Sequence, residues 1–270
     1  MGTEQGFLNR YTWMQQQQQQ QQTVPLQPGH VVAFKTSVGF VDHVWELLAP
    51  LLSEADMLLL PDAAAAAAAR DAGEDDGTTA GQQQQQQQQQ GVGRPQASLL
   101  LQPEALVQLL VQYKVTHLAA VPSVLQLWLP ALAAARQQLS LLQLVSSGEM
   151  LPTALAGNLL QALPERCLLL NLYGSTEVSA DATCQLVSSS LLASMQGPWL
   201  PAGQPIANLM MAVGRSSSSS SSSKNGRMRE LLVPLPVGYE GEVWVAGPGL
   251  AAGYLPQQTP IVVHSVQVRH

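Results

Sequence analysis

The middle of the chain, residues 103–187, shows two hydrophobic periods that take turns. Short apolar runs at 117–121, 141–145 and 167–172 have the length of buried strands. Between these runs, apolar side chains recur three and four residues apart, which is typical of helices. Strands that alternate with helices in this way predict an α/β fold, in which a parallel sheet carries helices on both faces.

The helices predicted between these strands begin at residues that favour a first helical turn. Pro103 suits the first turn of one helix, and Ser123 is predicted to cap the next. A third helix is predicted over residues 152–163. The carboxylate of Glu149 is expected to cap this third helix.

The two flanks of this regular part differ from each other. Upstream, the pattern predicts strands at 31–40 and 57–60 with a helix at 44–52 between them. Downstream, segments rich in Gly and Pro alternate with short apolar stretches, which predicts antiparallel strands joined by tight turns. We therefore divide one domain into an α/β portion, residues 1–200, and a small β-rich portion, residues 201–270.

Homopolymer tracts of Gln, Ala and Ser interrupt the pattern. They occupy residues 15–22, 63–69, 82–90 and 216–223. Such tracts offer too little varied apolar surface to offset the entropy of ordering them, so we expect low-complexity inserts in surface loops outside the sheets. About 200 residues remain for folded structure, which suits a single domain.

Composition narrows the class of protein. Charged residues make up 11% of the chain and the net charge is −6, so a basic face for nucleic acid is not expected. No apolar run approaches the roughly 20 residues that a membrane span needs. The chain has two cysteines, Cys167 and Cys184, too few for a disulfide framework. A reducing compartment, the cytoplasm or an organelle, is therefore expected.

Candidate chemistry lies where two predicted strands end. Ser147 and Gly148 follow one strand, and the sequence Tyr-Gly-Ser-Thr-Glu, residues 173–177, follows the next. Ligands of parallel sheets bind beyond the carboxyl ends of the strands. The Thr176 hydroxyl and nearby backbone N–H groups suit a phosphate, and Glu177 suits magnesium. A plain turn with a solvated Glu177 explains the same residues, so both interpretations stand at this point.

Six segments bear on this choice through their residues and their order along the chain. The segments are KTSVGFVDHVWE at 35–46, VTHLAAVPS at 115–123, LVSSGE at 144–149, YGSTE at 173–177, GQPIAN at 203–208 and the Gly-rich stretch at 238–254. Together they resemble the adenylate-forming superfamily, the AMP-dependent synthetases and ligases, and within it the adenylation domains of nonribosomal peptide synthetases and related acyl-activating enzymes. The chain resembles a fragment of the large N-terminal domain of such enzymes.

The resemblance implies an ATP or AMP site with Mg²⁺. Thr176 would contact the α-phosphate and Glu177 would bind Mg²⁺, which makes these two the expected catalytic residues. Tyr173 would stack on adenine and Asn171 would lie near its amino edge. The residues expected to bind the nucleotide are Gly148, Asn171, Tyr173, Gly174 and Ser175.

The resemblance also implies a small-molecule carboxylate as substrate, with CoA or a carrier-protein thiol as acceptor. Val41, Asp42 and Ser147 are the expected substrate-binding residues. Val41 stands where amino-acid-activating members carry an aspartate, and Asp42 follows one position later. On a strand, neighbouring side chains point to opposite faces, so either the backbone differs locally or this chain does not use that aspartate. An amino-acid substrate is therefore not favoured. Trp45 and Glu46 are expected to fix a helix start.

Three features of the superfamily find no match in these 270 residues. They are the phosphate loop, the ribose-binding aspartate and the domain with the catalytic lysine. We therefore expect a fragment of an ATP-dependent carboxylate-activating ligase that is inactive as this chain. The alternative is a non-catalytic remnant that acts as a binding or scaffold protein through its low-complexity tracts.

Overall fold

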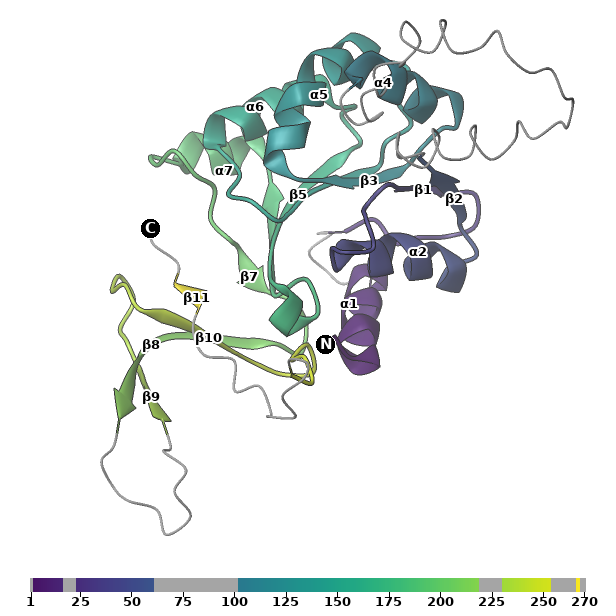
Figure 1. Ribbon diagram of the computed structural model, residues 1–270. Helices are drawn as coiled ribbons and strands as arrows, with labels where there is room; N and C mark the ends of the chain where they lie inside the picture. The colour runs from purple at the N-terminus through teal and green to yellow at the C-terminus, as the bar shows by residue number, and fades with distance from the viewer. Residues whose placement is uncertain (1, 17–22, 61–101, 219–229, 254–265, 268–270) are drawn as a thin grey trace, which may run out of the picture.

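Two β-sheets organise the chain in the computed structural model (Figure 1). A seven-stranded sheet has the order β2-β1-β3-β4-β5-β6-β7, and a four-stranded sheet has the order β11-β10-β8-β9. The structure describes residues 2–16, 23–60, 102–218, 230–253 and 266–267.

The described elements follow one another as helix, strand and helix in the first part and as strands in the last. The helices are α1 (Glu4–Gln15), α2 (Asp42–Leu52), α4 (Pro103–Gln112), α5 (Pro122–Ala135), α6 (Thr153–Ala162) and α7 (Ser189–Ser194), with a short 3₁₀ helix at Thr176–Val178. The strands of the large sheet are β1 (Val31–Phe34), β2 (Asp56–Leu59), β3 (His117–Ala120), β4 (Gln143–Ser146), β5 (Leu168–Tyr173), β6 (Thr183–Val187) and β7 (Gln204–Pro205). Those of the small sheet are β8 (Met210–Ser218), β9 (Glu230–Pro234), β10 (Glu242–Ala246) and β11 (Val266–Gln267).

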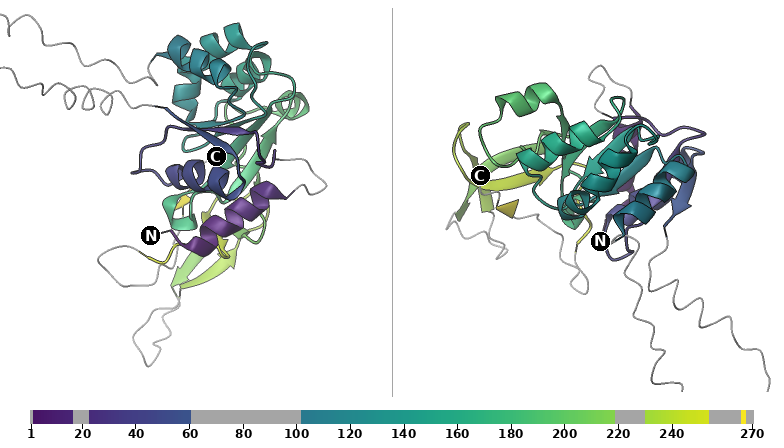
Figure 2. Two further views of the ribbon diagram at one scale, coloured as in Figure 1. Left: turned by 90° about the vertical axis from the view of Figure 1, so that its right-hand side faces the viewer. Right: turned by 90° about the horizontal axis from the view of Figure 1, so that it is seen from above.

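The large sheet is parallel from β2 to β5 and antiparallel at β6 and β7. From β1 the chain first moves outward to β2, at the edge of the sheet, and later returns to β3, which lies on the other side of β1. Because crossovers between parallel strands are right-handed, this reversal places helices on opposite faces. Figures 1 and 2 show α4 to α7 on one face and α1 and α2 on the other, as the sequence predicts. Ligands of such sheets bind near the point of reversal, here between β1 and β3.

The core lies between the central strands and α4, α5 and α6. All four residues of β4 are buried, the polar Gln143 and Ser146 included, which fits the burial of parallel strands on both faces. Trp128, Leu106 and Leu159 are among the large side chains that are fully buried in this cluster. Burial of each such side chain contributes about 1.5–3 kcal/mol, so this core fixes where the strand ends lie.

Two expectations about helix caps are wrong. Helix α5 begins at Pro122, so Ser123 lies inside its first turn and does not cap it. Glu149 caps α5 instead of α6: its carboxylate accepts from the N–H and the hydroxyl of Ser123 at 3.0 and 2.8 Å. The first strand is also shorter than predicted, because it ends at Phe34 and residues 37–40 form a turn.

The tracts behave differently from one another. Gln15 is the last residue of α1, and its amide exchanges two hydrogen bonds with the backbone of Leu26. Ser216, Ser217 and Ser218 pair with β9 in the small sheet, so the expectation that the Ser tract lies outside the sheets is wrong for these three. The Ala tract at 63–69 and the Gln tract at 82–90 lie outside the described residues.

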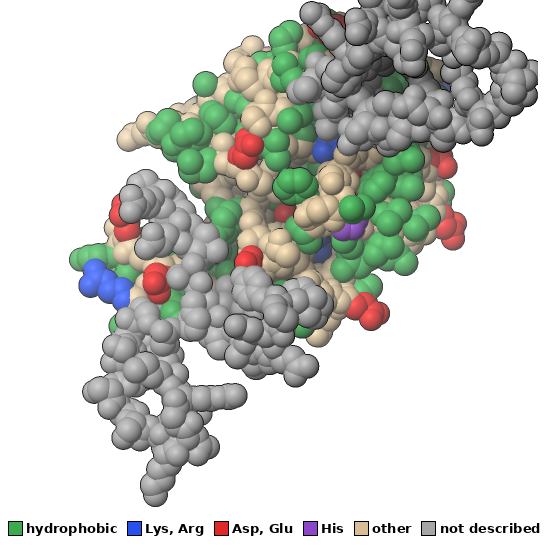
Figure 3. Space-filling view, viewed as in Figure 1, with side chains coloured by type: hydrophobic (Ala, Val, Ile, Leu, Met, Phe, Trp, Pro, Cys, Tyr) green, Lys and Arg blue, Asp and Glu red, His purple; other side chains and the backbone are tan. Residues whose placement is uncertain are grey.

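Charged side chains are sparse on the face that Figure 3 shows. Lys and Arg side chains appear there singly among apolar and neutral polar groups. Across the described ranges, no helix is both long enough and apolar enough to cross a membrane.

Candidate functional site

The predicted Tyr-Gly-Ser-Thr-Glu segment forms a closed turn, residues 173–182, which we call the glycine turn. Its base is closed by the N–H of Ala182 donating to the carbonyl of Tyr173 at 2.8 Å. Inside it, the N–H groups of Val178 and Ala180 donate to the carbonyl of Ser175 at 3.1 and 3.0 Å. A Cβ on Gly174 would overlap the carbonyl of Ala180, so the closure requires glycine at this position.

The glycine turn also holds backbone strain. Ser179 and Ala180 have φ angles of 56° and 91°, a region that residues other than glycine adopt uncommonly. Such conformations persist only where the surrounding structure holds them, and they cluster at functional sites. The turn is therefore a preformed loop that depends on its neighbours.

The second predicted segment ends the neighbouring strand. In the register of β4 and β5, Ser146 pairs with Asn171, so Ser147 and Gly148 leave the sheet beside the start of the glycine turn. Gly148 has a φ of 85°, which favours glycine, and is exposed. The fold thus brings the two predicted segments to one edge of the sheet, as expected for neighbouring parallel strands.

The side chains of the glycine turn differ in what they can offer a ligand. Thr176 is exposed, and Glu177 and Tyr173 are half-buried. Burial raises the pKa of Tyr173, so its phenol is neutral at physiological pH. Asn171 is buried and its amide donates to the carbonyl of Pro201 at 3.0 Å, so this side chain is already used within the protein.

The acidic groups of the site suit an ion such as magnesium, which needs few protein ligands, more than a metal site built from protein side chains alone. Among the described residues, no three His, Cys, Asp or Glu side chains group closely enough to hold a metal ion by themselves. Mg²⁺ commonly takes one or two carboxylates and completes its shell with phosphate oxygens and water. Glu177, whose backbone carbonyl accepts from the N–H of Ala251 at 2.8 Å, has the donor chemistry for that role.

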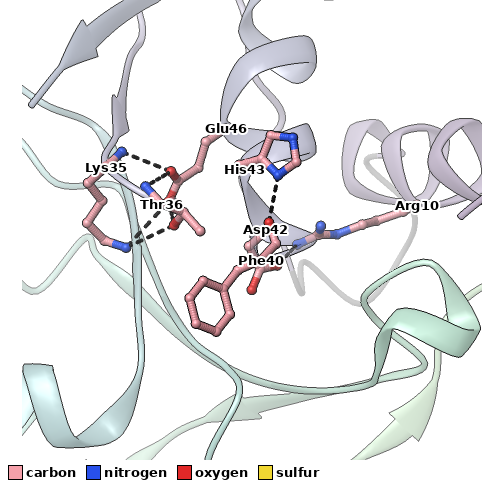
Figure 4. Close-up of polar contacts among 7 residues, drawn as sticks. All are labelled: Arg10, Lys35, Thr36, Phe40, Asp42, His43 and Glu46. Carbon is pink, nitrogen blue, oxygen red and sulfur yellow. Dashed lines mark hydrogen bonds and ion pairs between the residues drawn. The ribbon is translucent and has the colours of Figure 1, made fainter. Parts of the chain in front are cut away.

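A buried polar group lies at the carboxyl end of β1, on the other side of the reversal point. The carboxylate of Glu46 is fully buried and accepts from the N–H groups of Lys35 and Thr36 at 2.9 and 2.8 Å. It also accepts from the Thr36 hydroxyl at 2.8 Å, and the Lys35 ammonium lies 3.5 Å away (Figure 4). Glu46 therefore ties the end of β1 to α2, which is a structural role other than the expected one of fixing the helix start.

Val41 and Asp42 do not lie on a strand. Val41 has helical dihedral angles and precedes α2, and Asp42 is the first residue of that helix. The argument from alternating strand faces is therefore wrong at these positions. The carboxylate of Asp42 has a partner within the protein, the guanidinium of Arg10 at 3.4 Å (Figure 4). The exposed ring of Phe40 lies nearby (Figure 4). The backbone carbonyl of Phe40 is hydrogen-bonded to Nδ1 of the His43 ring at 2.7 Å.

Sequence reasoning missed a buried ion pair beneath the glycine turn. Arg10 and Asp181 are both buried, and their side chains form an ion pair. Burial raises the pKa of Asp181 to about 7, the guanidinium of Arg10 opposes that rise, and the carboxylate of Asp42 adds to it. A signal was available: Gly6, Arg10 and Met14 share one face of α1, and Arg10 is a charge on that buried face.

This geometry has a counterpart among known proteins. Residues 90–255 match the family of AMP-binding enzymes, more than half of the chain. The chain belongs to that family. Its members bind an adenine nucleotide, so the resemblance inferred from six short segments is confirmed.

One curated member is similar along almost the whole chain. The indigoidine synthase of Dickeya dadantii is 30% identical over 249 residues, which are 92% of this chain and 13% of that protein. The chain therefore spans a small part of the length of this larger AMP-binding enzyme.

Solved adenylation domains share the fold. AlmE from Vibrio cholerae, in complex with glycyl-adenosine-5'-phosphate, matches with a TM-score of 0.62 and 19% identity over 95% of this chain and 38% of that one. The N-terminal subdomain of NpsA from Klebsiella oxytoca, in complex with 3-hydroxybenzoyl-AMSN, matches with a TM-score of 0.60 and 18% identity. Here too the match covers 95% of this chain, and it covers 50% of the chain of that subdomain. The α/β fold of an AMP-binding enzyme is thereby established for this chain.

Proposed function

We propose that this chain is part of an ATP-dependent ligase that activates a carboxylate as its adenylate. The observation that carries the proposal is the glycine turn at the carboxyl end of β5, beside the end of β4, in a member of the AMP-binding family. Ligands of parallel sheets bind at such ends. The two solved relatives described above hold an acyl adenylate or a related compound, which fits this reaction.

In the proposed site the nucleotide lies over the glycine turn. Tyr173 stacks on adenine, Asn171 lies near its amino edge, and Gly148 lets the backbone approach the base. Gly174 and Ser175 also contact the nucleotide. Thr176 contacts the α-phosphate and Glu177 binds Mg²⁺. A carboxylate oxygen of the substrate attacks the α-phosphorus, the bond to the bridging oxygen breaks, and pyrophosphate leaves. Preorganised donors of the turn stabilise the charge that develops on phosphate oxygens, and a Mg²⁺ ion held by Glu177 would add to that stabilisation.

The adenylate is then open to a thiol. The sulfur of CoA or of a carrier protein attacks the acyl carbon, AMP leaves, and a thioester forms. Cys167 and Cys184 are both buried and free, and burial raises the pKa of each to about 12, so neither supplies this thiolate. Free buried thiols fit a reducing compartment, which we take to be the cytoplasm.

We propose that the substrate is a carboxylic acid that carries no amino group for Asp42 to bind. It would lie near Val41, Asp42 and Ser147. Support comes from the contact between Asp42 and Arg10, since a carboxylate already paired with a guanidinium gains less from a substrate ammonium.

We expect the purified 270-residue chain to bind nucleotide weakly and to show no turnover. The glycine turn supplies one side of the site, and the motifs for the phosphate loop, the ribose and the catalytic lysine have no match in these residues. Charged hydrogen bonds contribute about 1.5–3 kcal/mol each, so three missing contacts weaken binding by roughly 4.5–9 kcal/mol. At about 1.4 kcal/mol per tenfold, this is roughly three to six decades in affinity.

Calorimetry with ATP and Mg²⁺ tests the proposed binding. We expect weak heat of binding that Glu177→Ala removes and that Glu165→Ala leaves unchanged. Glu165 is a matched control, because its side chain is 94% exposed and it precedes β5 at the opposite edge of the sheet. Equal binding by the wild type and the Glu177→Ala variant would overturn the assignment of this carboxylate.

Exchange of pyrophosphate into ATP tests the catalytic part. Over a panel of fatty, aromatic and amino acids, we expect no carboxylate-dependent exchange by this chain. Exchange that Glu177→Ala abolishes would confirm the ligase activity and refute our expectation that this chain is inactive.

A further inference from the structure

Helix α1 packs one face against the far side of the glycine turn. The buried residues of that face, Gly6, Arg10 and Met14, recur every four residues. Gly6 lies so close to Ser179 that a Cβ would come within 2.6 Å of the Ser179 Cβ. One turn further along, Arg10 forms its ion pair with Asp181. The helix thus contacts the glycine turn at two residues, one of them strained.

The contacts of α1 fall on the strained part of the glycine turn. Ser179 and Ala180 have positive φ angles, and Asp181 follows them directly. A hydrogen-bonded base at Tyr173 and Ala182 closes the turn, and the N–H groups of Ser179 and Ala180 donate within it at 3.3 and 3.0 Å. Packing of the neighbouring elements adds to these bonds in holding the strained backbone. Ser179 is 8% exposed and Asp181 is 2% exposed, so this packing is tight.

Arg10 also connects the turn to the other elements of the site. Its guanidinium lies 3.4 Å from Asp42 at the start of α2 and 5.6 Å from the ring centre of Trp45. Next to it, the side chain of Asn9 donates to the carbonyl of Ala207 at 2.9 Å and accepts from Asn208 at 2.8 Å. Helix α1 therefore contacts three segments that are far apart in the sequence and meet beside the site.

We propose that α1 holds the glycine turn in its ligand-binding conformation and that Arg10 is the positioning residue of this support. The inference rests on the proposed function, since the side chains to be positioned are Thr176 and Glu177. Arg10 does not contact the nucleotide and acts through Asp181. Asp181 lies on the same closed turn as Thr176, five residues after it. A guanidinium in a fixed planar geometry with a buried carboxylate suits this role, because it holds orientation as well as distance.

A general contribution to stability is the competing explanation, and local measurements separate the two. We would compare amide hydrogen exchange in residues 173–182 with exchange in residues 143–146, the buried strand β4, for the wild type and Arg10→Ala. We expect exchange in the glycine turn to rise at least tenfold while β4 stays protected. The control is Arg136→Ala, an arginine that is partly exposed and paired with the exposed Glu165.

Conservative variants keep the test decisive. Arg10→Lys retains the charge without the planar fork, so turn exchange should fall between that of the wild type and Arg10→Ala. Asp181→Asn should raise turn exchange as Arg10→Ala does. If Arg10→Ala does not fold, these two variants carry the comparison. An equal rise in both regions, or no rise in the turn, would overturn the proposal.

Calorimetry with ATP and Mg²⁺ on the same proteins links the turn to ligand binding. We expect Arg10→Ala to weaken the affinity about tenfold and Arg10→Lys to restore part of it. Unchanged affinity with faster turn exchange would overturn the positioning role. If the wild type binds no nucleotide but the exchange result holds, the proposed function fails while the support of the turn by α1 stands.

Discussion

Removal of the Glu46 carboxylate should destabilise the protein far more than removal of an exposed carboxylate with similar partners. Glu46 is 0% exposed and accepts three hydrogen bonds from Lys35 and Thr36, two of them from backbone N–H groups. In Glu46→Ala, these donors and the Lys35 ammonium, which lies 3.5 Å from the carboxylate, lose their partner in a buried place. Breaking a buried charged pair from one side costs about 3–5 kcal/mol.

The matched control is Glu149→Ala. Its carboxylate also accepts from one backbone N–H and one hydroxyl, those of Ser123, but it is exposed, so water replaces it in the variant. Loss of a helix cap of this kind costs about 0.5–2 kcal/mol. The two variants therefore compare the same chemistry in a buried and in an exposed setting.

Urea unfolding followed by tryptophan fluorescence measures both costs, and thermal melting checks them. A loss of about 3–5 kcal/mol for Glu46→Ala lowers the melting temperature by about 6–20 °C at roughly 2–4 °C per kcal/mol. Glu46→Gln keeps an acceptor oxygen without the charge, so its cost should fall between those of the two alanine variants. A cost for Glu46→Ala no larger than that of Glu149→Ala would refute the reasoning from burial.

Two further predictions concern the core. Burial lowers the pKa of His117 from 6.5 to about 4, so the unfolded chain binds a proton that the folded chain does not as the pH falls through this window. The His117 contribution to the free energy of unfolding should therefore fall by up to about 3 kcal/mol between pH 6.5 and 4, while the raised pKa of Asp181 acts in the opposite direction over the same window. The difference between the wild type and His117→Gln isolates the His117 part, and equal pH slopes for the two proteins would contradict the assignment. Trp128→Ala should lower the free energy of unfolding by about 3–5 kcal/mol, because this side chain is fully buried. The control Leu127→Ala, on the same helix with Leu127 41% exposed, should change it by about 0.5 kcal/mol or less, and equal losses would count against the burial of Trp128.

The sequence alone determined the central architecture. Strands β3, β4 and β5 and helices α4, α5 and α6 lie within one or two residues of their predicted positions. Hydrophobic patterning is a local property, and central strands of a parallel sheet show it as short apolar runs because both of their faces are buried. The family could also be inferred from the sequence. Its motifs are short contiguous segments at strand ends, so their residues can be recognised without knowledge of the fold.

The tertiary structure alone decided how these segments are supported. Asp42 and Glu149 each bind a partner 26 or more residues away, and Arg10 joins Asp181 from a helix near the start of the chain. Nothing in the local pattern specifies such pairs, because the distance between two charges depends on how the elements pack. The antiparallel strand β6 also depends on packing, since a strand takes its direction from its neighbour in the sheet. Local sequence therefore placed the residues of the glycine turn, and long-range contacts determined what holds that turn in shape.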